Sequence, residues 1–322
     1  MRFLVVGAGA VGGYFGGRLL QAGRDVTFLV RPARAAKLAQ TGLAIQSRFG
    51  DTSLPSPPTV TADKLRDPFD VVLIACKAYD LEAAIQDFAP AVSSNTSVIP
   101  LLNGMRHLDA LDAKLGEEHV LGGVSLISAR LDDTGRIVHI GDTHRIVFGD
   151  RKPRSTRAEE IAAAMAGALF ECRASKDIIL EMWEKWVFLA TLAGATCLMR
   201  AAVCDIVGAA GTGFLNGLFE ECRTIATAAG QSPRAEFLKR AVSVLHDPVS
   251  PITASMLADL ERGGPTEADH ILGDLLSRRP VVQPGETSLL QIAYIALKAS
   301  AARALREKKA GTKSNVDESS LK

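Results

Sequence analysis

The sequence predicts an α/β domain built on a parallel sheet, followed by an all-α domain. Three observations support this fold class. Short β-branched runs alternate with amphipathic stretches in the first half of the chain, and strand signals disappear after about residue 175. The length of 322 residues also fits two domains better than one, since a domain usually holds roughly 150 residues.

Alternating elements make up the first half. Runs rich in Val, Ile and Leu are the strand candidates, at residues 2–6, 25–30, 70–75, 97–101 and 120–127. Helical spacing of apolar residues lies between several of them, at residues 11–22, 34–41 and 81–91. Residues 135–140 and 144–148 resemble the two strands of a hairpin. We therefore expect a parallel sheet with crossover helices, and then the hairpin.

The second half is helical in pattern from residue 177 to 305. Ser250-Pro251 is typical of a helix start, with Arg262-Gly263-Gly264 as its end. Thr266 and Asp269 fit a capping box for the next helix. We expect an α/β domain over residues 1–174 and a helical domain over 175–305. The polar residues 306–322 are expected to be a disordered tail.

Composition excludes several classes of function. Lys and Arg total 37 against 36 Asp and Glu, so the formal charge is +1 and no basic field favours nucleic acid. The apolar residues 187–199 are too few to span a bilayer, and the apolar start, residues 3–17, holds too many glycines for a signal peptide. Because the cysteines form no CxxC motif and have no nearby His, we expect no metal, reduced buried thiols and a cytoplasmic protein.

A glycine motif near the N-terminus predicts a dinucleotide site. Gly7-Ala8-Gly9-Ala10-Val11-Gly12 fits GxGxxG, follows the first strand and opens a helix. Gly7 would permit the tight turn, Gly9 the approach of a pyrophosphate, and Gly12 the close packing of helix on strand. The first domain is therefore expected to be of the Rossmann type. The alternative is a glycine-rich turn that binds no cofactor.

The residue after the second strand bears on which dinucleotide binds. An acid at this position binds the ribose 2′-hydroxyl of NAD, whereas Arg accommodates the 2′-phosphate of NADP. Here the strand ends in Arg31, Arg34 follows, and no carboxylate comes after the strand until Asp51. This pattern favours NADP(H) with Arg31 on the phosphate, although Arg31 could also be a solvated residue at a strand end.

An ordered set of short motifs extends the interpretation over nearly the whole chain to about residue 300. After the glycine motif come Cys76-Lys77-Ala78, Leu102-Asn103-Gly104-Met105, Trp183-Glu184-Lys185-Trp186, Glu221 with Ala228-Ala229-Gly230, and Ser255-Met256 leading to Thr266-Glu267. In these motifs the chain resembles the ketopantoate reductase (2-dehydropantoate 2-reductase) family. The resemblance implies NADPH-dependent reduction of ketopantoate to pantoate, in pantothenate biosynthesis.

The resemblance also implies roles for individual residues. Lys185 would be the catalytic lysine, and Glu267 a catalytic carboxylate that orients the substrate. Lys77 and Asn103 would line the nicotinamide end of the cofactor, with Asn103 also near the substrate, and Ser255 would contact the substrate carboxylate. Such groups suit the reaction, because hydride transfer to a 2-keto carbon leaves an alkoxide that needs a proton and a nearby positive charge.

Each of these residues also has a simpler interpretation. Lys185 lies four residues after Glu181, the favourable order for a helix ion pair. Glu267 lies in the first turn of its expected helix, where the helix dipole stabilises a carboxylate. Asn103-Gly104 is a common turn dipeptide. Lys77 and Ser255 could be an ordinary strand-end cation and a first-turn hydroxyl.

Three positions depart from the family pattern. Leu189, Ala193 and Leu272 stand where the family usually has asparagine, which puts the substrate in doubt more than the hydride chemistry. A reductase of a more apolar 2-keto acid or ketone is therefore one alternative, and a non-catalytic NADP(H)-sensing protein is another. The helical domain could also support a homodimer.

Overall fold

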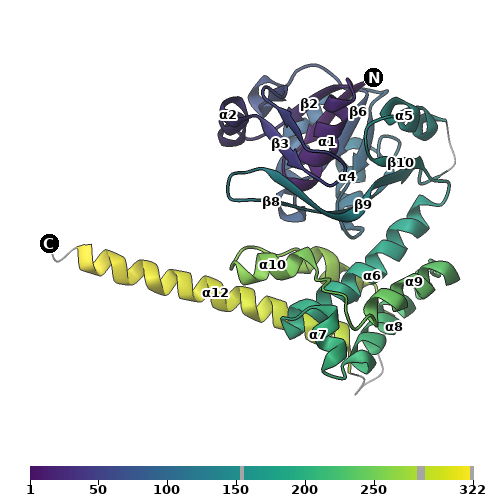
Figure 1. Ribbon diagram of the computed structural model, residues 1–322, viewed down its shortest axis with the longest axis vertical. Helices are drawn as coiled ribbons and strands as arrows, with labels where there is room; N and C mark the ends of the chain where they lie inside the picture. The colour runs from purple at the N-terminus through teal and green to yellow at the C-terminus, as the bar shows by residue number, and fades with distance from the viewer. Residues whose placement is uncertain (153–155, 281–286, 320–322) are drawn as a thin grey trace. The chain divides into compact units, whose positions relative to one another are not determined.

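The computed structural model describes residues 1–152, 156–280 and 287–319, with side chains as far as residue 307. The chain divides into two compact units, Met1–Met182 and Trp183–Lys322 (Figure 1). The division falls within helix α6 (Ile178–Met199), a little after the expected boundary at residue 174.

The first unit contains a five-stranded parallel sheet in the order β5-β2-β1-β6-β7. The strands are β1 (Arg2–Val6), β2 (Asp25–Leu29), β5 (Thr59–Val60), β6 (Val71–Ile74) and β7 (Ser97–Pro100). Helices α1 (Ala10–Gln21), α2 (Pro32–Thr41), α3 (Leu81–Phe88) and α4 (Arg106–Leu115) follow β1, β2, β6 and β7 respectively. This confirms the predicted parallel sheet with helical crossovers; the short strand β5 was not predicted.

A second sheet lies in the same unit, with the order β10-β9-β3-β4 and with β8 paired to β9. Its strands are β3 (Leu43–Gln46), β4 (Thr52–Leu54), β8 (Gly122–Leu131), β9 (Ile137–Gly149) and β10 (Glu171–Ala174), and helix α5 (Arg157–Met165) precedes β10. The predicted strand at residues 120–127 therefore belongs to this sheet. The predicted hairpin is wrong, because residues 137–149 form one strand that pairs antiparallel with β8.

The reason is an irregularity in β9 rather than a turn. Ile127 and Ser128 of β8 pair with His144 and Ile140, so residues 141–143 bulge out of the ladder. Without the bulge His139 and His144 would point to opposite faces, whereas here they face β8 positions two apart and their rings stack at 5.4 Å. The Tyr14 hydroxyl lies 2.7 Å from Nδ1 of His144, which ties α1 to this sheet.

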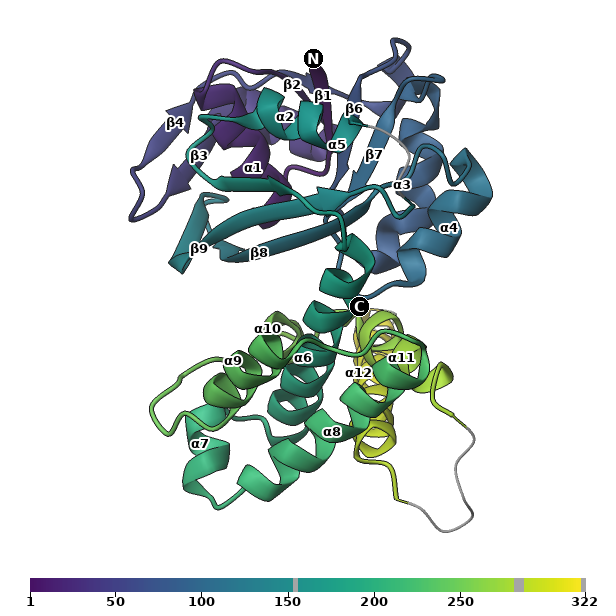
Figure 2. The same cartoon turned by 90° about the vertical axis from the view of Figure 1, so that its right-hand side faces the viewer.

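Helix α1 packs between the two sheets (Figure 2). A Cβ at Gly16 would lie 2.5 Å from the Phe28 ring of the parallel sheet. On the other side, a Cβ at Gly13 would lie 2.6 Å from Ile137 of the second sheet, and one at Gly17 would lie 2.8 Å from Ile45. Glycines on two faces thus keep the helix narrow enough for both sheets to approach it.

The second unit is helical, as predicted. After α6 come α7 (Val203–Gly208), α8 (Thr212–Ala228), α9 (Ala235–Leu245), α10 (Ser255–Glu261), the π-helical turn η4 (Asp269–Gly273), α11 (Asp274–Ser277) and α12 (Leu289–Ser319). Trp186, Leu218, Leu272 and Leu290 are among its fully buried side chains. Within the described residues no helix is both long and apolar enough to cross a membrane.

Two predicted helix starts in this unit are wrong. The helix expected from Ser250 begins at Ser255, because the carbonyls of Ser250 and Ile252 accept hydrogen bonds from the start of α7 and hold the chain extended. The helix expected from Thr266 begins at Ala268, and its first part is the π-helical η4.

Residues 306–319, expected as a disordered tail, continue α12 as a helix that extends beyond the other helices of its unit (Figure 1). An ion pair supports this extension, since Arg303 Nε lies 2.8 Å from Glu307 Oε1, four residues on.

Replacing Gly16 tests the packing of α1. Gly16→Ala is expected to be less stable than Gly213→Ala by about 1–3 kcal/mol in the free energy of unfolding, the usual cost of overpacking a core. Both changes exchange Gly for Ala in a helix, but a Cβ at Gly213 of α8 would meet nothing within 4 Å. Urea unfolding measures the difference; equal stabilities would contradict the packing role.

Candidate active site

The residues predicted to bind a dinucleotide follow the carboxyl ends of neighbouring strands. Because β2, β1, β6 and β7 are adjacent and parallel, the segments that follow them share one sheet edge. Along this edge lie Arg31 after β2, the glycine motif after β1, Lys77 after β6 and Asn103 after β7. Backbone hydrogen bonds extend the ladder there, from Gly7 N to Leu29 O at 3.0 Å and from Ala75 N to Val6 O at 3.0 Å.

The glycine motif has the backbone geometry that a bound diphosphate requires. Gly7 adopts a φ of 96°, which favours glycine, and a Cβ at Gly12 would lie 2.1 Å from the Gly7 carbonyl oxygen. A Cβ at Gly9 would meet no described atom within 4 Å, so the outer side of the loop is open. Among the described residues no side chain caps α1, and its first turn holds no acid. The loop therefore fits an anion at a helix N-terminus.

Arg31 and Arg34 occupy different positions at this edge. Arg31 is exposed, and its Nη2 lies 2.6 Å from Oδ1 of Asp80, whose carboxylate raises the pKa of Arg31. Arg34 donates from Nε and Nη2 to the Ala8 carbonyl, at 3.1 and 2.8 Å, and burial lowers its pKa. Arg34 thus holds the glycine loop, and Arg31 is the cation at the strand end.

Lys77 and Asn103 lie farther along the same edge, as the order of the strands requires. Lys77 is half-buried just before the 3-10 turn η2 (Ala78–Asp80). Asn103 is half-buried in the segment between β7 and α4. The edge therefore carries polar groups on both sides of the glycine motif, and its residues fit a dinucleotide.

The second unit brings Lys185 and Glu267 close enough for their charges to interact. Lys185 lies on α6, and its burial lowers the pKa of its ammonium group to about 8, while attraction to the Glu267 carboxylate raises it. The side chain of Glu267 is buried. A lysine with a pKa near neutrality can both donate and accept a proton at physiological pH.

The segment that carries Glu267 is fastened at several points. The Glu267 carbonyl accepts hydrogen bonds from the backbone of His270 and Ile271 at the start of η4. The Trp186 indole donates to the Ile271 carbonyl at 2.8 Å, so the neighbour of Lys185 holds this turn. From α12, Tyr294 and Lys298 bind the Asp269 carboxylate at 2.6 and 2.8 Å. Isolated π-helical turns are frequent at functional sites.

The helix around Lys185 has its own anchor. The buried Glu184 carboxylate accepts hydrogen bonds from the backbone N and the Nε of Arg234, both at 2.9 Å, at the start of α9. Glu181, the alternative ion-pair partner proposed for Lys185, is bound by Arg173 at 2.6 Å and by Ser175 at 2.5 Å. The charge that acts on Lys185 is that of Glu267.

The remaining predicted positions lie elsewhere in this unit. Ser255 is the exposed first residue of α10. Of the three positions predicted to depart from the family pattern, Leu272 and Ala193 are buried and Leu189 is half-buried. Leu272 contributes to the core, where its side chain lies near Gly194 of α6.

Sequence reasoning missed Asp80, Glu184, Arg234 and Trp186 as supports of the two sites. Arg31 and Asp80 are 49 residues apart, and Glu184 and Arg234 are 50 apart. Asp80 can be found in the sequence three residues after Lys77, but no local sequence pattern links it to Arg31.

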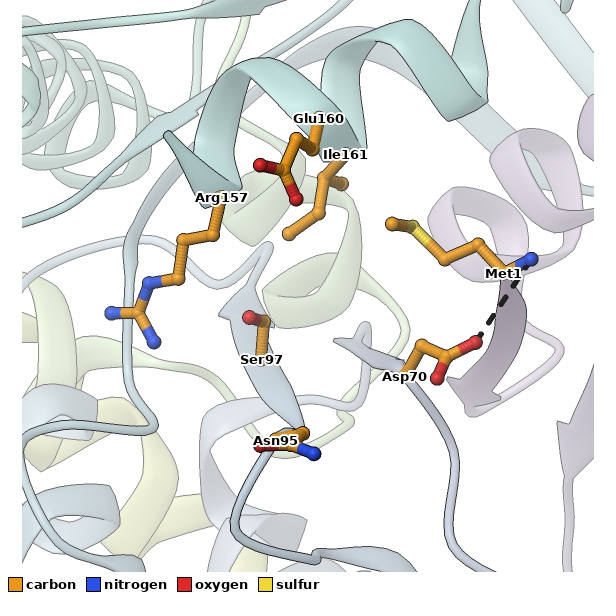
Figure 3. A pocket seen from close by; sticks show the side chains of 7 residues that line it. All are labelled: Met1, Asp70, Asn95, Ser97, Arg157, Glu160 and Ile161. Carbon is orange, nitrogen blue, oxygen red and sulfur yellow. Dashed lines mark ion pairs between the residues drawn. The ribbon is translucent and has the colours of Figure 1, made fainter. Parts of the chain in front are cut away.

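A hollow of about 350 Å³ lies at the opposite edge of the parallel sheet (Figure 3). Asp70 and Ser97, at the amino ends of β6 and β7, line it together with Met1, Asn95, Arg157, Glu160 and Ile161. Asp70 lies 4.0 Å from the terminal amine. In parallel sheets cofactors bind at the carboxyl edge, so this hollow is separate from the predicted site.

Comparison with known proteins covers both units. Family models described as ketopantoate reductase PanE/ApbA and as its C-terminal part match residues 3–153 and 177–280. A solved D-mandelate dehydrogenase with NADH and anilino(oxo)acetate has the same fold, with a TM-score of 0.84 at 20% identity over 94% of this chain and 99% of its own. The 2-dehydropantoate 2-reductase of Geobacter metallireducens has a TM-score of 0.83 at 27% identity, over 93% and 100% of the two chains.

Sequence relatives agree with this grouping. An uncharacterized oxidoreductase of Bacillus subtilis, YkpB, is 39% identical over 86% of this chain and 92% of its own. The 2-dehydropantoate 2-reductase of Archaeoglobus fulgidus is 30% identical over 86% and 90% of the two chains. The chain therefore belongs to the ketopantoate reductase family of oxidoreductases.

Proposed function

We propose that the protein is an NADPH-dependent reductase of 2-keto acids, with ketopantoate as the first candidate substrate and pantoate as its product. The observation that carries the proposal is the pairing of Lys185 with Glu267, in which burial lowers the pKa of the lysine to about 8. Such a lysine is still mostly protonated at neutral pH and can give up its proton during the reaction.

The proposed reduction needs a group that stabilises the negative charge formed on the keto oxygen. A nicotinamide dinucleotide at the edge of the parallel sheet would supply the hydride. As the keto carbon is reduced its oxygen becomes negative, and the Lys185 ammonium stabilises that charge and then donates a proton to the oxygen. Glu267 keeps Lys185 charged before the reaction, because attraction between them opposes the effect of burial.

The cofactor and the substrate class have separate support. Arg31 at the end of β2 favours a 2′-phosphate and therefore NADPH. Relatives named 2-dehydropantoate 2-reductase support a 2-keto acid as the substrate. The homodimer, the cytoplasmic location and the role of Ser255 stay predictions from the sequence.

An absorbance assay of NADPH oxidation with a panel of branched 2-keto acids tests the function. We expect turnover with at least one of them, and Lys185→Ala should lower kcat by about 10²–10⁴-fold, the range for loss of a general acid. Lys239→Ala, which removes an exposed lysine of the same unit, should retain activity. Tight NADPH binding without turnover of any keto acid would contradict catalysis and favour an NADP(H)-sensing protein.

The pH dependence tests the role of Glu267. Because reduction uses protonated Lys185, kcat/KM for the keto acid should be level below about pH 8 and fall above it. Glu267→Gln removes the charge that raises the pKa of Lys185, so the fall should move to lower pH. A profile that does not move in Glu267→Gln would show that Glu267 acts only on structure.

A second candidate is a reductase of the same kind that acts on a more apolar 2-keto acid. Leu189 lies one helical turn after Lys185, on the same face of α6, where the family usually has an amide. An apolar side chain there does not hydrogen-bond a substrate hydroxyl, so ketopantoate loses its advantage over analogues that lack the hydroxyl.

Two substrates that differ by one hydroxyl group decide between these candidates. We expect Leu189→Asn to raise the ratio of kcat/KM for ketopantoate to that for trimethylpyruvate, which lacks the hydroxyl, by about 10-fold, a common value for one hydrogen bond. Leu198→Asn, the same change at another half-buried position of α6, should leave the ratio unchanged. An unchanged ratio in Leu189→Asn would remove Leu189 from substrate recognition.

A further inference from the structure

We propose that Asp80 is a specificity-determining residue that weakens the preference for NADPH over NADH by holding Arg31. The inference rests on the proposed function, since it concerns the dinucleotide that the sheet edge would bind. It assigns to Asp80 part of the role that an acid at the end of β2 plays in NAD-binding proteins, although Asp80 comes from the segment after β6.

The position of the ion pair supports this role. In the sheet β1 lies between β2 and β6. Arg31 follows β2, Asp80 follows β6, and their side chains meet at 2.6 Å. The pair therefore joins the two segments that flank the carboxyl end of β1, where the glycine motif begins. Any dinucleotide on that motif would have its adenosine ribose next to β2, beside this pair.

The orientation of the Asp80 side chain is unusual for its place in the chain. Asp80 occupies the N-cap position of α3, where an aspartate commonly accepts a hydrogen bond from the first turn. Here the described residues include no such side-chain bond, and Oδ1 accepts from Arg31. The Asp80 carboxylate thus binds Arg31 at the sheet edge and does not cap α3.

The charges then oppose each other at the 2′-phosphate position. Such a phosphate carries about 1.5–2 negative charges at pH 7 and pairs well with Arg. Asp80 adds a negative charge next to the same guanidinium, so it repels the phosphate and competes for Arg31. A ribose 2′-hydroxyl, in contrast, can donate to a carboxylate and leave the ion pair intact. Arg34 is less available for the phosphate, because Nε and Nη2 of its guanidinium donate to the Ala8 carbonyl.

The pair is weak enough to be displaced. The Arg31 side chain is 71% exposed and that of Asp80 34% exposed, and ion pairs of this kind stabilise folds little. Loss of the Asp80 charge should therefore change ligand preference without unfolding the protein. Asparagine is also a good N-cap residue, which makes Asp80→Asn a conservative test.

Titration calorimetry of the full chain with NADPH and with NADH tests the proposal. In Asp80→Asn the Kd for NADPH should fall by about 5- to 10-fold, the Coulombic effect of one charge near a phosphate dianion in water, while the Kd for NADH stays the same or rises. The gain should shrink as salt increases. In an Arg31→Gln background, Asp80→Asn should give a smaller gain, because it then relieves only the direct repulsion of the phosphate and releases no guanidinium.

A control variant distinguishes the effect of the Arg31–Asp80 ion pair from that of removing any negative charge nearby. Asp87 also raises the pKa of Arg31 through its charge, and Asp87→Asn makes the same change of charge on α3. Asp87→Asn should alter the Kd for NADPH by less than about 2-fold, because solvent and salt weaken charges at a distance. Equal gains from Asp87→Asn and Asp80→Asn, or equal effects of Asp80→Asn on NADPH and NADH, would overturn the proposal.

Binding also distinguishes this inference from the proposed function. If the dinucleotides bind but no keto acid is reduced, the catalytic proposal fails and the Kd values still judge Asp80. If keto acids are reduced and Asp80→Asn leaves the NADPH to NADH ratio of Kd values unchanged, the role of Asp80 fails alone. If neither dinucleotide binds the unaltered protein, both proposals are wrong.

Discussion

Contact of one helix with two sheets is the constraint on which the first unit depends. Helix α1 must pack against the parallel sheet and against the second sheet, and a side chain larger than hydrogen at Gly16 or Gly13 would contact Phe28 or Ile137 too closely. The same helix begins at the glycine loop that a dinucleotide would contact. The glycines of α1 therefore set the distance between the two sheets. They also set the position of the loop whose backbone amides would face the dinucleotide.

In the second unit, side-chain hydrogen bonds of neighbouring residues hold the segments that carry Lys185 and Glu267. Glu184 binds Arg234, Trp186 binds the Ile271 carbonyl, and Asp269 is bound from α12. Within this frame, burial lowers the pKa of Lys185 and attraction to Glu267 raises it. Burial would be costly for either charge alone, and their attraction reduces that cost.

The sequence predicted the parallel sheet because β-branched runs such as residues 71–74 are buried on both faces, and such runs are easily recognised. It missed β5, which is two residues long, and it mistook the bulge at residues 141–143 for a turn because Gly and Asp are common in both. Lys185 and Glu267 came from the resemblance to a family. Their electrostatic coupling, and the Arg31 to Asp80 contact, depend on tertiary structure that no local pattern contains.

The indole of Trp186 has a consequence for how enzymes of this type can diverge. It holds η4 through a backbone carbonyl, so the attachment does not depend on which side chains η4 presents. Leu272 can therefore be an apolar core residue within that turn, while Glu267, two residues before the turn, acts on Lys185. Side chains of η4 can therefore change without displacing the carboxylate whose charge acts on Lys185.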